Sequence, residues 1–144
     1  MTKVRSYQDS DYPQLKALYE NGDLYGGQFD PARDARERLQ DIIAKDAEAI
    51  LVYEDNNEIM GTISLIDDGR VAWLFRFAVA HGAQEKTVAK ELYQTACDIF
   101  ARRGHTQVLV YSPVGHVNLD ARYHELLGMN KGNAYTCYWT ELKK

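Results

Sequence analysis

The strongest constraint on the fold is a strand, a long helix and a second strand that follow one another between residues 71 and 111. Residues 71–79 have the composition of a strand. Residues 84–103 carry apolar side chains at spacings of three and four, and Gly104 stands where glycine commonly ends a helix. The apolar run 107–111 is typical of a buried strand. Two strands joined through a helix pair in parallel, so this segment predicts a βαβ unit.

The rest of the chain predicts shorter elements around this unit. Alternating or apolar patterns predict strands at residues 3–7, 49–53, 58–65 and 134–142, and helical spacings predict helices over residues 12–19, 35–43 and 118–127. Clusters of Asp, Asn and Gly separate the three central strands, which indicates an antiparallel meander. The order predicts an α/β (α+β) fold, with a mixed, mostly antiparallel sheet, a central parallel βαβ unit and helices on both faces.

The size and composition favour one folded domain over residues 1–144. The chain has 144 residues, of which 45% are hydrophobic and 26% charged, and it has no low-complexity tract. Its apolar runs are too short to span a membrane, and the first residues lack the apolar stretch of a signal peptide. We therefore expect a cytoplasmic protein.

The net charge of −4 conceals an asymmetry along the chain. Through Gly69 acidic residues outnumber basic ones by 15 to 7, whereas from Arg70 onward basic residues outnumber acidic ones by 10 to 6. A basic second half can hold a polyanionic cofactor while an acidic first half attracts a cationic substrate, although solvated surface charge explains the pattern equally well. Nucleic acid is not an expected partner of so acidic a chain.

The two cysteines, Cys97 and Cys137, are too few for a disulfide framework. They also show no metal-ligand spacing with the four histidines, so no metal site is predicted. Free cysteine is usually a small core residue. We expect both to be buried thiols rather than catalytic groups.

The segment 77–92 is similar to the cofactor motif of the GNAT (N-acetyltransferase) superfamily. That motif consists of a strand end, a connector and the pattern Arg/Gln-x-x-Gly-x-Gly/Ala at the start of a long helix. Gln84 and Ala89 stand at its first and last positions, and Thr87 stands where the family usually has glycine. The predicted strand around Gly61 also resembles the family's strand that usually carries a glycine. The resemblance covers essentially the whole chain and implies a GNAT-like fold with acetyl-CoA as co-substrate.

The resemblance also implies where the cofactor binds. The start of a helix offers N–H donors and a positive dipole end to a diphosphate, and Lys86 and Lys90 add positive charge. Glu85 adds a negative charge, and the Thr87 side chain either crowds the phosphate or donates a hydrogen bond to it. Main-chain groups at the end of the preceding strand would pair with the pantetheine arm. The implied cofactor-binding residues are Phe77, Ala78, Val79, Gln84, Lys86, Thr87, Val88, Ala89, Lys90 and Asn118.

Two residues compete for the role of general acid. The segment 118–129 looks like the family's Asn-x-x-Ala followed by Phe-Tyr-Glu-x-Leu-Gly-Phe. Counting back from Gly128 places His124 at the position of the family's tyrosine. The distance from Asn118 to Gly128 is one residue shorter than usual, which leaves Tyr123 as the alternative. The sequence does not separate the two.

The resemblance implies direct attack of a neutral primary amine, of a small molecule or a peptide, on the thioester. A backbone N–H near Phe77 or Ala78 would stabilise the developing oxyanion. The candidate bases for the amine proton are Glu20, Asp23 and Asp30, each of which is equally well explained as a surface carboxylate. The sequence does not name the acceptor.

Two other functions stay open. The altered loop, with Thr87 and Glu85, favours a catalytically inactive GNAT-like domain that binds a ligand or a protein. The last predicted strand carries Tyr135, Tyr138 and Trp139, which would form the surface of a homodimer if they are exposed and part of the core if they face inward.

Overall fold

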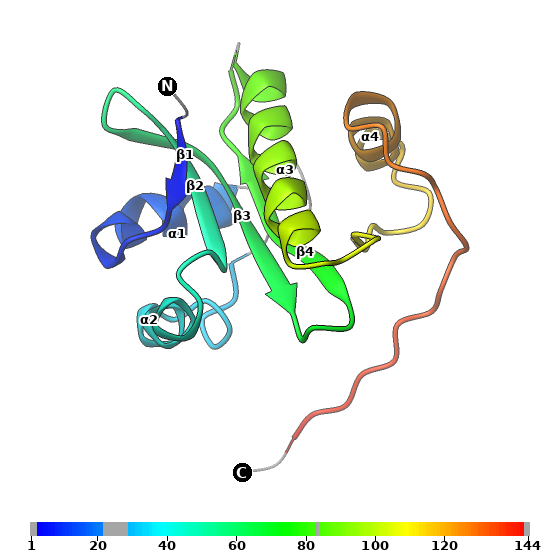
Figure 1. The fold of residues 1–144 in the computed structure, drawn as a ribbon, viewed down its shortest axis with the longest axis horizontal. Coiled ribbons are helices and arrows are strands. Elements are labelled where there is room, and N and C mark those ends of the chain that lie inside the picture. The colour runs from blue at the N-terminus through cyan, green and yellow to red at the C-terminus, as the bar shows by residue number, and fades with distance from the viewer. Residues whose placement is uncertain (1–2, 22–28, 83, 143–144) are drawn as a thin grey trace.

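The computed structural model describes residues 3–21, 29–82 and 84–142 of the chain (Figure 1). Its elements, in chain order, are β1 (Val4–Ser6), the 3₁₀ turn η1 (Asp9–Asp11), α1 (Tyr12–Asn21), α2 (Arg36–Lys45), β2 (Ile50–Asp55), β3 (Glu58–Asp67), β4 (Ala72–Val79), α3 (Glu85–Arg102), α4 (Val117–Asp120) and the π-helix η2 (Ala121–Leu126). The predicted helices and the first four predicted strands are all present, with small differences at their ends.

The sheet has the strand order β1-β2-β3-β4, and each neighbouring pair is antiparallel. The segment after α3 joins β4 through one parallel bridge between Trp73 and Leu109. The Leu109 N–H donates to the Ala72 carbonyl, and the Leu109 carbonyl accepts from the Leu74 N–H, both at 2.9 Å. The predicted parallel direction is confirmed, but the predicted strand at 107–111 is reduced to this bridge.

Helices cover both faces of the sheet, as predicted (Figure 1). The core on one side contains Val88 and Leu92 of α3, and the core on the other contains Leu15 and Tyr19 of α1. Gly61 of β3 lets α3 approach closely, because a Cβ atom there would lie 2.6 Å from the Val88 Cγ1 atom. The glycine therefore serves the packing of α3 on the sheet.

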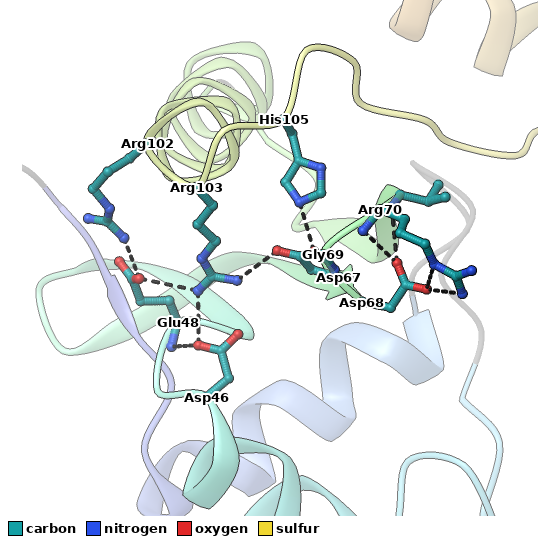
Figure 2. Close-up of polar contacts among 10 residues, drawn as sticks. Asp46, Glu48, Asp67, Asp68, Gly69, Arg70, Arg102, Arg103 and His105 are labelled. Carbon is teal, nitrogen blue, oxygen red and sulfur yellow. Dashed lines mark hydrogen bonds and ion pairs between the residues drawn. The ribbon is translucent and has the colours of Figure 1, made fainter.

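Arg103 fixes the end of α3 to two loops (Figure 2). Its guanidinium lies 3.0 Å from the Asp46 carboxylate after α2 and 3.2 Å from the Asp67 carboxylate at the end of β3. His105 contacts the other Asp67 oxygen through Nε2 at 2.7 Å. Burial alone would raise the pKa of Asp67, but hydrogen bonds from the Gly69 N–H, His105 and Arg103 together hold it below its ordinary value.

The predicted last strand at 134–142 is wrong. These residues form no strand, and every side chain from residue 130 to residue 142 is exposed. Alternation supplies strand propensity, but a strand also needs a neighbouring edge, and within the described part of the chain this segment pairs with none. Figure 1 shows it running away from the body of the protein. Tyr135, Tyr138 and Trp139 are accordingly 75%, 90% and 78% exposed.

The prediction of two buried thiols is also wrong. Cys137 lies on the exposed C-terminal segment, and Cys97 on α3 is only partly buried. Burial raises the pKa of the Cys97 thiol, which keeps it in the unreactive thiol form at neutral pH. This geometry agrees with the expectation that Cys97 is not a nucleophile.

Candidate active site

A bulge interrupts β4 next to the predicted cofactor strand. Thr62 lies opposite Ala78 and Ser64 lies opposite Phe75, so two residues of β4 oppose one residue of β3. Arg76 sits in this bulge with a φ of +49°, a conformation that is uncommon for a residue with a side chain. The surrounding contacts must hold it there.

Those contacts form a buried ion pair with Asp34. The Arg76 Nε atom lies 3.0 Å from one Asp34 oxygen, and a terminal nitrogen lies 3.0 Å from the other. The Asp34 side chain is 3% exposed and also accepts from the Asp30 N–H at 2.8 Å, while the Tyr12 hydroxyl donates to the Asp34 carbonyl at 2.8 Å. The Arg76 guanidinium lies 4.6 Å from the centre of the Phe75 ring.

Sequence reasoning did not single out Arg76 or Asp34. The available signal was an arginine in the middle of an otherwise apolar central strand, because a buried charge requires a partner. The partner lies 42 residues away in the chain and therefore follows from the fold alone. The pair joins the β4 bulge to the loop that precedes α2.

The turn between β4 and α3 leads directly into the predicted phosphate site. Gly82 has a φ of +149°, which only glycine adopts readily, and its carbonyl accepts from the Glu85 N–H at 3.3 Å. The Val88 N–H donates to the Gln84 carbonyl at 2.9 Å inside the helix. Main-chain donors to an outside anion must therefore come from residues before Val88.

The structure divides the predicted cofactor residues of α3 into two groups. Gln84, Lys86, Thr87 and Lys90 are exposed around the start of the helix. In contrast, Val88 and Ala89 are 1% and 0% exposed and belong to the core beneath α3. The side chains available to a polyanion are thus those of the first group.

Arg122 is a basic residue at this site that sequence analysis missed. Its Nε atom lies 3.8 Å from the Glu85 carboxylate in the first turn of α3. This contact brings η2 against the start of α3 and offsets the negative charge that Glu85 places there. The only sequence signal was the position of Arg122 beside the two candidate acids.

The three predicted strand residues lie on two sides of the sheet. Phe77 and Val79 are buried in the core shared with α3, and Ala78 is buried in the core shared with α1. The parallel pairing described between β4 and the segment after α3 stops at Leu109, and Pro113 follows soon after. An extended ligand can therefore lie along the end of β4 in the manner of an added strand.

Tyr123 and His124 face different environments. Tyr123 is 7% exposed and belongs to the same core cluster as Phe77 and Val79. His124 is exposed, and its Nδ1 atom donates to the Met129 carbonyl at 2.7 Å, which closes the end of η2. Asn118 is exposed on α4. Of the two candidate acids, Tyr123 is the one on the side of β4 and α3.

The candidate bases are engaged elsewhere or fall outside the described residues. Asp30 accepts hydrogen bonds from the Arg33 and Ala32 N–H groups, which hold its pKa below the ordinary value and make it a poor base. Glu20 is exposed and pairs with Lys16 at 3.7 Å. Asp23 lies outside the described part of the chain.

A hollow of about 490 Å³ lies between α1 and the end of β4. Its lining includes Gln14 and Leu18 of α1, Ile59 of β3, Val79 of β4 and His81 of the following turn. A second hollow of about 470 Å³ borders α2 and Phe75. The first is the better candidate for a substrate because it adjoins the turn that leads into the predicted phosphate site.

The described part of the chain offers neither a cluster of metal ligands nor a helix that could span a membrane. Among residues 3–21, 29–82 and 84–142, no group of three or more His, Cys, Asp or Glu side chains is placed to hold a metal ion. None of the helices described is long and apolar enough to cross a membrane.

Sequence comparison decides the family. The model of the acetyltransferase (GNAT) family matches residues 8–129, which include the βαβ unit, the bulged strand and η2. The chain belongs to the GNAT acetyltransferase family. The resemblance and the fold class inferred from the sequence are thereby confirmed. No curated protein matches the GNAT chain significantly over its sequence.

Solved structures share the GNAT fold at low sequence identity. An aminoglycoside 6′-N-acetyltransferase from Acinetobacter haemolyticus is similar with a TM-score of 0.74 and 12% identity, covering 97% of this chain and 99% of that one. Glucosamine-6-phosphate N-acetyltransferase from Arabidopsis thaliana has a TM-score of 0.68 and 17% identity, covering 96% and 98%. The PaiA N-acetyltransferase from Thermoplasma acidophilum, in complex with coenzyme A, has a TM-score of 0.68 and 18% identity, covering 85% and 86%.

Proposed function

We propose that this GNAT protein is a single-domain, acetyl-CoA-dependent N-acetyltransferase that acetylates a primary amine of a small molecule or a peptide. One observation carries the proposal: the contact between Arg122 and Glu85 brings η2, which carries the buried Tyr123, against the start of α3, and the turn after β4 leads into the same helix start. An anion site, a strand edge and a proton donor are the three parts that acetyl transfer from a thioester requires.

The start of α3 would bind the diphosphate of acetyl-CoA. Lys86 and Lys90 are exposed there, and the helix dipole favours negative charge. Thr87 is also exposed, so its side chain does not fill the core beneath the turn and its hydroxyl can donate to a phosphate oxygen. Arg122 compensates for Glu85, which otherwise opposes an anion.

The reaction needs few groups from the protein. The amine nitrogen bonds to the thioester carbonyl carbon, and the carbon–sulfur bond then breaks. A backbone N–H near Phe77 or Ala78 stabilises the oxygen that gains negative charge, and the β4 bulge at Arg76 sets the direction of these groups. The Tyr123 hydroxyl would donate its proton to the departing sulfur, and the proton that the amine nitrogen loses would return to the Tyr123 oxygen, directly or through water.

The acceptor amine would occupy the hollow between α1 and the end of β4. This hollow adjoins Val79 and His81, which places it next to the strand that would carry the thioester. The acidic first part of the sequence, with 15 acids against 7 bases through Gly69, favours a cationic acceptor. One of the fold neighbours is an aminoglycoside acetyltransferase, and polyamines, aminoglycosides and peptide amines all have the required charge.

A second candidate is a GNAT-fold binding domain without catalysis. Thr87 at the family's glycine position and Glu85 in the first turn of α3 favour it, because both weaken an anion site. This domain would bind a ligand or protein without consuming acetyl-CoA.

Release of free thiol from acetyl-CoA, measured over a panel of amines, separates the two functions. The transferase releases thiol only with an acceptor present, and Tyr123→Phe lowers the rate by about 10²-fold or more. His124→Ala is the matched control, since His124 is exposed, and it should change the rate little. Binding of acetyl-CoA without thiol release from any amine would favour the inactive domain, and equal rates in both variants would remove Tyr123 from its role.

A further inference from the structure

The hollow of about 470 Å³ between α2 and β4 has no part in the proposed acetyl transfer. We call it the α2 hollow, and its volume lies in the range of small-molecule sites. Its charged lining consists of three basic residues and one acidic residue, and its apolar lining includes an aromatic ring. These residues are Arg33, Arg38, Lys45, Asp41, Ile42 and Phe75. The lining therefore carries a formal charge of +2.

The fold brings this lining together from three segments. The four residues that α2 contributes recur at spacings of three and four, so they share one face of that helix. Arg33 lies in the turn that precedes α2, and Phe75 lies beside the bulge of β4. The Phe75 side chain is only partly buried. The α2 hollow thus combines a group of cations with an accessible aromatic surface.

The three cations of the α2 hollow differ from the other bases in the first half of the sequence. Through Gly69 the chain has 7 bases against 15 acids. The four bases outside the hollow are all ion-paired, and they are Lys3, Arg5, Lys16 and Arg36. In contrast, none of the three cations of the hollow is ion-paired with a residue in the ranges 3–21, 29–82 and 84–142. Unpaired positive charge is thus gathered at one hollow of an acidic half.

Acids beside these cations in the sequence are committed to other partners. Asp34 binds the buried Arg76, and Asp46 pairs with Arg103 at 3.0 Å. Asp41 lines the α2 hollow, but one carboxylate does not neutralise three cations. Charges of one sign around a concave surface repel one another and concentrate a potential that attracts the opposite charge. An anion in the hollow would relieve this repulsion.

We propose that the α2 hollow binds a small organic anion that joins a phosphate or carboxylate group to a flat apolar ring. The anionic group would lie against Arg33 and Arg38, because guanidinium groups match the oxygens of both anions. The ring would cover Phe75 and the 40% exposed Ile42, which removes apolar surface from water. An inorganic ion would make only the first of these contacts. The site is independent of the proposed acetyl transfer.

Calorimetric titration of the full chain with phenyl phosphate and, separately, with benzoate tests the site. Saturable binding of either compound, one molecule per chain, is expected, and the tighter of the two identifies the preferred anionic group. Inorganic phosphate should bind at least about threefold more weakly than phenyl phosphate, because it lacks the ring. No binding of either aryl anion at millimolar concentration, or equal affinity for inorganic and phenyl phosphate, would overturn the proposal.

The double variant Arg33→Gln/Arg38→Gln identifies the residues that bind the anion. Both side chains are exposed, so the unfolding midpoint in urea should stay close to that of the wild type. The affinity for the aryl anion should fall about tenfold, because two charge-assisted contacts are lost. Arg70→Gln is the matched control, since it removes an 86% exposed cation on the turn before β4, and it should leave the affinity unchanged. An equal loss in both variants would contradict a local site.

The start of α3 also attracts anions, so Lys86→Glu separates the two sites. This variant should weaken the binding of coenzyme A but not that of phenyl phosphate. A loss of phenyl phosphate binding in Lys86→Glu, with none in Arg33→Gln/Arg38→Gln, would overturn the site in the α2 hollow. A failure of coenzyme A to bind would instead count against the proposed function alone.

Discussion

Replacing Arg76 should destabilise the fold strongly, because it breaks a buried ion pair. The substitution Arg76→Ala leaves the Asp34 carboxylate, which is 3% exposed, without its cation. Breaking a buried ion pair from one side costs about 3–5 kcal/mol, because the remaining charge stays desolvated. Arg76→Gly removes the same cation but relieves a backbone held at a φ of +49°, which returns roughly 1–2 kcal/mol. The alanine variant should therefore be the less stable of the two.

Urea unfolding of four proteins measures these differences: the wild type, Arg76→Ala, Asp34→Asn and the double variant. Because both single variants break the same contact, the double variant should lose less stability than the sum of the two. The difference between that sum and the double variant is the coupling energy of the pair. A loss below about 1 kcal/mol in Arg76→Ala, with additive effects in the double variant, would show that the pair does not hold the bulge.

Three further outcomes follow from the packing and charge of the described residues. Gly61→Ala should cost about 1–3 kcal/mol in unfolding free energy, because its Cβ would meet Val88, whereas the matched control Gly132→Ala meets nothing within 4 Å and should cost little. The pKa of Asp67 lies below its ordinary value, so ionised Asp67 stabilises the fold above about pH 3.9, and this stabilisation is lost as the pH falls through the folded-state pKa. Asp67→Asn should therefore show a smaller loss of unfolding free energy in that acid range than the wild type. An unchanged pH profile would contradict this. Lys86→Glu should weaken the affinity for coenzyme A more at low than at high salt, and an effect independent of salt would argue against an electrostatic role.

The sequence predicts the central part of the fold well because its signals are local. The spacing of Val88, Leu92 and Phe100 and the glycine after the helix define α3 without reference to other segments. The parallel direction of the following segment then follows from the helical connection. The failure at 134–142 has the opposite cause, because alternation records strand propensity and not whether an edge is within reach.

The sequence predicts only those parts of the candidate site whose residues are adjacent in the chain. The start of α3 and the end of β4 are adjacent in sequence, so the motif places their residues together. The bulge at Arg76 depends on the register between β3 and β4, which single-residue patterns do not reveal. Counting back from Gly128 favours His124, but the wide turn of η2, where the Leu127 N–H donates to the Arg122 carbonyl, turns Tyr123 inward and His124 outward.

The position of Cys137 illustrates the same limit. Free cysteine is most often buried, and this statistical preference led to the prediction of a buried thiol. Cys137 is instead exposed, because the whole segment that carries it lies outside the core. The predicted burial of a side chain is therefore wrong whenever the strand or helix that carries it is wrongly predicted.

Calorimetric titration of the wild-type chain with coenzyme A tests most directly whether the start of α3 binds a diphosphate. Coenzyme A should bind saturably, one molecule per chain, and Lys86→Glu should weaken this binding at least tenfold at low salt. An absence of heat at millimolar coenzyme A, with the protein shown to be folded, would contradict it.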